Sequence, residues 1–145
     1  MYSSAIWRGV TSLNAKNSSS LFKEYYQKVA PTVKAILPVD LSARLKSGEQ
    51  IHVLDVREPY EWNESIIPNA TYTGRGRLEM DVENIVQDQD DAIVIYCARG
   101  FRSVLAAKAL MEMGYRNVSH LEGGIGAWKE QELPTLNNSP SYHVE

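Results

Sequence analysis

The stretch AIVIYCARGFRSVLAAKALMEMG, residues 92–114, decides the fold because it joins an apolar run to an amphipathic one through a short loop. The run AIVIYC is apolar without interruption, which is typical of a strand buried on both faces of a parallel sheet. The following segment has only two charged interior positions, Lys108 and Glu112, four residues apart. They predict a helix with one narrow solvent-facing stripe and otherwise buried faces, ending at Gly114. The stretch therefore predicts a strand–loop–helix unit.

The same alternation of strands and helices runs through the rest of the chain. Strands are expected at 35–37, 51–56, 70–74, 92–97 and 117–124, and helices at 38–49, 58–65, 77–87, 102–114 and 125–133. This order predicts a three-layer α/β domain with a mainly parallel five-stranded sheet flanked by helices. In such sheets the active crevice lies at the carboxyl ends of the strands, where Asp55, Arg57 and Cys97 are expected.

Length and composition indicate one soluble globular domain, with 145 residues, 43% hydrophobic and 23% charged. We expect an N-terminal extension at 1–34 with a helix at about 20–30, the α/β domain at 35–135, and a polar tail at 136–145. The first 22 residues contain no acid. They are interpreted as a polar extension, with a transit peptide as the alternative. The expected location is accordingly cytoplasmic, or an organellar matrix if the segment is a leader.

Several classes of partner are disfavoured by the sequence. The net charge of -3 does not suggest a nucleic-acid partner, and no apolar run approaches the roughly 20 residues that span a bilayer. The single cysteine, Cys97, forms no disulfide within the chain, which indicates a reducing compartment. The histidines at 52, 120 and 143 lack ligand spacing. We therefore expect no metal, no cofactor and no membrane association.

The loop after the central strand carries the expected chemistry. Backbone amides of residues 98–103 and the start of the next helix should point at the Cys97 sulfur and favour its thiolate form, as should Arg99 and Arg102. Gly100 permits a backbone conformation that other residues resist. The alternative is a buried structural cysteine, since free cysteine often behaves as a small apolar residue. The two arginines and the glycine favour a nucleophile.

Four motifs resemble those of single-domain rhodanese-like sulfurtransferases of the thiosulfate type. They are DVREPYEW (55–62), IPNA (67–70), CARGFRS (97–103) and MGYRNVSHLEGGIGAW (113–128). The resemblance implies that Cys97 is a nucleophile that carries a persulfide, with Asp55 and Arg57 in support and the glycine pair 123–124 as a structural motif. It implies that the sulfur and its donor are held by Ala98, Arg99, Gly100, Phe101, Arg102 and Ser103. Ile66 and Asn69 depart from the family pattern, in a structural turn.

Loop length separates this reading from a cysteine phosphatase, in which the phosphate-binding arginine follows the nucleophile by six positions. Here Arg102 follows by five and Ser103 by six, a shorter loop suited to one sulfur atom. We expect a small anionic donor such as thiosulfate and an external acceptor, either cyanide or a thiol. The alternative is a docking or sulfur-delivery module with a dedicated protein partner. Arg99 could instead face solvent, and Arg102 could be tied to a carboxylate, with Asp55 as one candidate. Arg75 and Arg77 are weak candidates for the mouth of the site, and no general base is assigned.

Overall fold

A computed structural model describes residues 20–137, so the interpretations of residues 1–19 and of the tail from 138 onward lie outside the described part of the chain. Five strands form one sheet in the order β1-β5-β4-β2-β3, and every pairing is parallel. The strands are β1 (Lys34–Ile36), β2 (Ile51–Asp55), β3 (Thr71–Tyr72), β4 (Ala92–Tyr96) and β5 (Val118–Leu121). The expected five-stranded sheet is confirmed.

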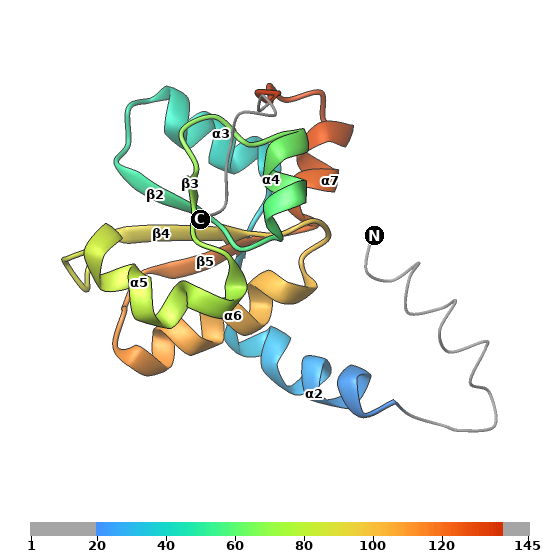
Figure 1. Cartoon of the computed structure of the whole chain (residues 1–145), viewed down its shortest axis with the longest axis vertical. Helices are drawn as coiled ribbons and strands as arrows, with labels where there is room; N and C mark the ends of the chain where they lie inside the picture. The colour runs from blue at the N-terminus through green and yellow to red at the C-terminus, as the bar shows by residue number, and fades with distance from the viewer. Residues whose placement is uncertain (1–19, 138–145) are drawn as a thin grey trace.

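Helices cover both faces of this sheet, which completes the expected three layers (Figure 1). One face carries α3 (Pro38–Lys46), α4 (Pro59–Glu64) and α7 (Gly124–Glu130). The other carries α5 (Leu78–Ile85) and α6 (Phe101–Met113), with α2 (Leu21–Val29) beside α6. Two short 3-10 turns, η1 (Ala30–Thr32) and η2 (Arg75–Arg77), follow α2 and precede α5.

The central strand β4 explains why its sequence is apolar at every position. Ile93 and Ile95 belong to the core beneath α5 and α6. Val94 and Tyr96 belong to the second core, which contains Trp128 of α7. Successive side chains of a strand point to opposite faces, so a strand covered on both sides needs apolar residues throughout.

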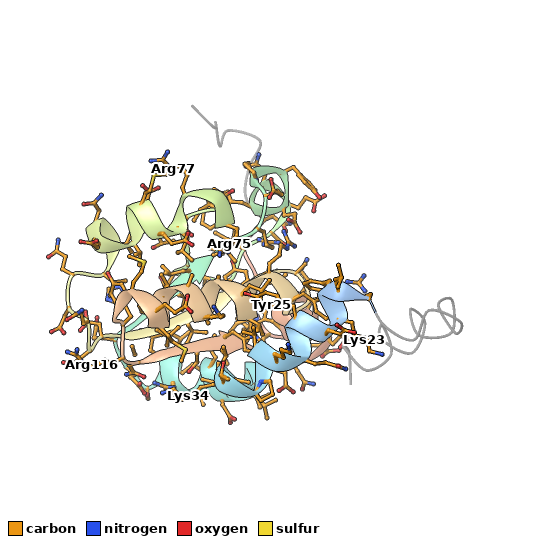
Figure 2. All side chains as sticks on the ribbon, turned by 90° about the horizontal axis from the view of Figure 1, so that it is seen from below. Lys23, Tyr25, Lys34, Arg75, Arg77 and Arg116 are labelled. Atoms are coloured by element: carbon orange, nitrogen blue, oxygen red, sulfur yellow. The ribbon has the colours of Figure 1, made fainter. Side chains whose placement is uncertain are left out.

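The helix predicted near residues 20–30 is α2. Ser20 caps its start, accepting a hydrogen bond from the Lys23 amide at 2.9 Å. The helix packs its aromatic side chains on the start of α6, as Figure 2 shows by the position of α2 alongside it. No helix in residues 20–137 is both long and apolar enough to cross a bilayer.

The last helix is shorter than the sequence predicts. We expected it to run from 125 to 133, but α7 ends at Glu130 because Glu132 takes a left-handed conformation with φ 57°. The chain then turns back, and Leu136 forms an antiparallel bridge with Ile66, each amide donating to the other's carbonyl at 2.9 Å. Ordered pairing thus reaches one residue past position 135.

The topology places the crevice between two particular strands. The chain leaves β2 towards β3 at one edge and leaves β4 towards β5 on the other side. This divergence, at paired neighbours β2 and β4, is the point where open α/β sheets bind ligands. Asp55 is in register with Tyr96, so the residue that follows Tyr96 emerges at this point. That residue is Cys97.

Candidate active site around Cys97

The Cys97 sulfur lies at the start of α6 and accepts two backbone hydrogen bonds. The Gly100 amide donates to Sγ at 3.1 Å and the Ser103 amide at 3.3 Å. Gly100 is the N-cap of this 13-residue helix, so the sulfur faces the helix end that carries partial positive charge. Cys97 itself is 1% exposed. The surroundings favour negative charge on the sulfur.

Two glycines make this loop possible. Gly100 has φ +102°, a left-handed conformation that favours glycine, and it turns the chain into α6. Gly124 allows α7 to approach the loop so closely that an added Cβ would lie 2.5 Å from the Cys97 and Ala98 carbonyl oxygens. The Ile125 amide donates to the Cys97 carbonyl at 2.9 Å, and the Gly126 amide to the Ala98 carbonyl at 3.0 Å. The carbonyl side of the loop is thus bound by α7, while the Gly100 and Ser103 amides face the sulfur.

Arg102 is bound to a carboxylate, as considered from the sequence, but the carboxylate is that of Glu61 in α4 and not the candidate Asp55. Its guanidinium donates to the two carboxylate oxygens of Glu61 at 2.8 and 3.1 Å. Burial alone would raise the pKa of Glu61, but hydrogen bonds from Arg102 and the Glu58 amide, with the Arg102 charge, hold that pKa below its usual range. Glu61 also caps α4 through the Glu58 amide at 2.9 Å. The pair therefore ties the cysteine loop to α4.

Asp55 and Arg57 form a buried ion pair with each other. Arg57 donates to both Asp55 oxygens through its guanidinium, at 2.7 to 3.1 Å, and through its amide, at 2.9 Å. The same guanidinium donates to the Ser65 carbonyl at 2.6 Å and lies 5.4 Å from the centre of the Tyr96 ring. Their side chains are 0% and 4% exposed. This pair holds the end of β2 against the loop that leads out of α4.

Residues 37–131 match the family model for the rhodanese-like domain, which covers most of the described α/β unit. The chain belongs to the rhodanese-like family. Its relatives include a sulfurtransferase of Allochromatium vinosum, 38% identical over 96 residues, 66% of this chain and 88% of that protein.

Two solved structures extend the comparison. The polysulfide-sulfur transferase homodimer of Wolinella succinogenes has a TM-score of 0.69 and 28% identity, covering 86% of this chain and 93% of that one. A Rhodopseudomonas palustris protein described as a possible tyrosine phosphatase has a TM-score of 0.75 and 32% identity, covering 81% and 96%. Membership of the family and general sulfurtransferase character are thus supported.

The rhodanese-like site contains a histidine that the sequence did not indicate. Ser103 Oγ lies 3.1 Å from His120 Nδ1, and the Cys97 thiol donates to the same Oγ at 3.5 Å. Burial lowers the pKa of His120 to about 4. The pairing of β5 with β4 places His120 there, since it is in register with Ile95, two residues before Cys97. No general base was assigned from the sequence, and the structure places a neutral imidazole next to Ser103, beside the cysteine.

The other loop residues expected at the site, Arg99, Phe101 and Ser103, lie in three different environments. Arg99 is exposed on the loop, whereas the Phe101 ring packs on Tyr26 of α2, with centroids 5.2 Å apart. Burial is the largest cause of the raised pKa of Tyr26, with smaller contributions from its interactions with Cys97 and Glu122. Ser103 is fully buried, with its amide and its hydroxyl both at the sulfur.

Arg75 and Arg77 form ion pairs within their own segment. Arg75 pairs with Glu79 and Arg77 with Asp81, each four residues ahead, both at 2.9 Å. Figure 2 shows Arg77 on the outer side of α5, pointing away from the sheet. The structure therefore does not bring Arg77 to the cysteine loop.

Proposed function

We propose that the protein is a sulfurtransferase that moves sulfane sulfur from thiosulfate, or a related persulfide donor, through a Cys97 persulfide to cyanide or a thiol. The observation that carries this proposal is the pair of amides on the Cys97 sulfur at the positive end of α6. Such donors stabilise anionic sulfur, both the attacking thiolate and the terminal sulfur of a persulfide. The sulfurtransferase relatives support the same chemistry.

The reaction is a double displacement. The Cys97 thiolate attacks the outer sulfur of thiosulfate, the sulfur–sulfur bond of the donor breaks, and sulfite leaves with the electron pair. The terminal sulfur of the resulting persulfide is then attacked by cyanide or a thiolate, which leaves as thiocyanate or a new persulfide. The Cys97 thiolate is regenerated without any net redox change. Cys97 is the chain's one cysteine, so the acceptor is external to this chain.

The two loop arginines have different roles in this proposal. Arg102 is bound bidentately to Glu61, so it braces the loop. Arg99 is exposed, and we assign it to attraction of the dianionic donor. Replacing Arg99 by Gln should therefore raise the KM for thiosulfate more than it lowers kcat.

A cysteine phosphatase is the second candidate, favoured by the relative described as a possible tyrosine phosphatase. Two features of this chain oppose it. The loop places Arg102 only five residues after Cys97, and the guanidinium that would bind a phosphoryl group is engaged by Glu61. A sulfur-delivery module is the third reading; it would accept sulfur from a partner protein's persulfide while remaining inert to thiosulfate.

The test is intact mass after incubation of the reduced protein with thiosulfate. We expect the mass to rise by one sulfur atom, the adduct to be absent in Cys97→Ser, and cyanide to remove it as thiocyanate. Hydrolysis of an aryl phosphate without any sulfur adduct would overturn the proposal in favour of the phosphatase. An adduct formed only from a protein persulfide, and never from thiosulfate, would replace it with the delivery module.

A further inference from the structure

His120 is a buried titratable side chain that the displacement described above does not use. It projects from β5 beside β4 and is 7% exposed. Its Nδ1 lies 3.1 Å from Ser103 Oγ, which in turn lies 3.5 Å from the Cys97 sulfur. The three side chains form one continuous chain of polar atoms, from the nucleophile through a fully buried hydroxyl to the imidazole.

The direction of the hydrogen bonds in this chain is determined by a single serine proton. The Ser103 hydroxyl has one hydrogen, which can be donated either to His120 or to the sulfur, but not to both. When Cys97 is a thiol, its S–H donates to Ser103 and the Ser103 O–H donates to an unprotonated Nδ1. When the sulfur is anionic it has no hydrogen to donate, and it gains a third donor only if Ser103 turns towards it. Because a bare Nδ1 would then face a lone pair of Ser103 Oγ, this turn is favoured when Nδ1 carries an N–H, which donates to Ser103.

We infer that His120 is a positioning residue for sulfur transfer: acting through Ser103, it sets whether the hydroxyl accepts from the Cys97 thiol or donates to the anionic sulfur. This inference rests on the proposed function for its role in transfer. In this scheme the imidazole is neutral both before and after Cys97 loses its proton. The thiol proton passes to Ser103 Oγ, the Ser103 proton passes to Nδ1, and the proton on Nε2 leaves to water. One proton is lost in total, and no other reactant is needed.

The neutral imidazole that this scheme requires agrees with the burial of His120, which lowers its pKa to about 4. A permanently charged imidazolium could donate from Nδ1 but could not accept from Ser103. Other titratable groups lie near enough to the sulfur to interact with its charge. Tyr26 of α2 and Arg102 of α6 both respond to the Cys97 charge, and Glu122 acts on Tyr26. The variants below leave all three residues in place.

The experiment compares two amides at position 120. Asn places its amide where Nδ1 stands, within reach of Ser103, and can accept or donate there. Gln places the same amide one bond farther from the backbone, as Nε2 is. The rate of alkylation of Cys97 by iodoacetamide is measured against pH, which reports the thiolate with no sulfur donor present. Ser103→Ala removes the middle of the chain while keeping the Ser103 amide.

We expect the midpoint of the alkylation curve to rise by about one pH unit in Ser103→Ala, from loss of one hydrogen bond to an anion. In His120→Gln the Ser103 hydroxyl remains but no N–H orients it towards the sulfur, so the midpoint should rise by a smaller amount. His120→Asn should keep the midpoint of the unmodified protein. The double variant Ser103→Ala with His120→Gln should match Ser103→Ala alone, because the two residues act in series. His52→Gln, a histidine bonded to Asp91 elsewhere, is the control and should leave the midpoint unchanged.

Three results would overturn the inference. They are an unchanged midpoint in Ser103→Ala, equal midpoints for Asn and Gln at position 120, or additive shifts in the double variant. If His120→Gln fails to fold, His120→Val replaces it, because Val also has no polar atom where Nδ1 stands; a midpoint equal to that of His120→Asn would overturn the inference. Failure of the proposed function is distinguishable, because the alkylation shifts would persist while thiosulfate left no sulfur on Cys97.

Discussion

The buried imidazole of His120 makes the stability of the protein depend on pH between about 4 and 6.5. Its pKa falls from an ordinary 6.5 to about 4 on folding, because burial penalises the charged form. The unfolded chain therefore binds a proton on this residue between those values, while the folded protein does not. The stabilisation from a neutral His120 is complete above pH 6.5 and is lost as the pH falls towards 4.

The size of the effect follows from these two values. Between pH 7.5 and pH 5 the unfolded chain binds a proton on His120 over about 1.5 pH units, from its pKa of 6.5 down to pH 5, while the folded protein stays neutral there. This corresponds to about 2 kcal/mol lost from the free energy of unfolding. His120→Asn lacks this titration, so its free energy of unfolding should fall by about 2 kcal/mol less over the same interval. Urea unfolding of both proteins at the two pH values, followed by circular dichroism, measures the difference.

The comparison between pH values cancels the fixed cost of the substitution, so only the change in stability is compared. His52→Asn provides the control for removal of a partly exposed histidine. If the protein and His120→Asn lose the same stability between pH 7.5 and pH 5, then His120 does not remain neutral in the folded state. The neutral relay to Ser103 would then be wrong as well.

Two further predictions concern the supports of the site. Asp55→Asn leaves Arg57 buried without its carboxylate and should lower the free energy of unfolding, measured in urea, by about 3–5 kcal/mol. Asp81→Asn, in an exposed pair, is the control and should lower it by less than about 1 kcal/mol. Equal losses would show that burial of the first pair does not matter. Gly124→Ala puts a Cβ 2.5 Å from the cysteine loop at φ +65° and should cost at least about 2 kcal/mol and slow Cys97 alkylation. Gly76→Ala, with open space around its Cβ, should do neither; a Gly124→Ala protein with unchanged reactivity would refute the contact.

The parts of this structure that depend on local pattern could be predicted from the sequence. The apolar run of β4 gave the strand, and Gly114 takes the left-handed conformation expected of a helix cap. The alternation of elements predicted the parallel sheet and placed Cys97 and Asp55 at strand carboxyl ends, and the structure shows that their two strands are neighbours. These features follow from periodicity, from glycine and from topology, all of which can be read along one segment at a time.

The parts that depend on side chains from distant segments could not be predicted. Arg102 had two carboxylates within reach of the crevice, and only the packing of α4 shows that Glu61 binds it while Asp55 is already engaged by Arg57. His120 stood in a strand of mixed character, where a histidine gives no signal of its own. The early end of α7 depends on one left-handed residue, Glu132, which is not a glycine.

The contact between α7 and the cysteine loop has a consequence for how changes in the chain propagate. The amides of Ile125 and Gly126 bind the carbonyl side of the cysteine loop, so α7 helps to set the shape of this loop. The segment that contains α7 therefore cannot be exchanged without an effect on the cysteine loop. Deleting or replacing residues 123–134 should alter the reactivity of Cys97, although none of those side chains needs to contact the sulfur. When the cysteine loop is exchanged between relatives, this segment should be exchanged with it.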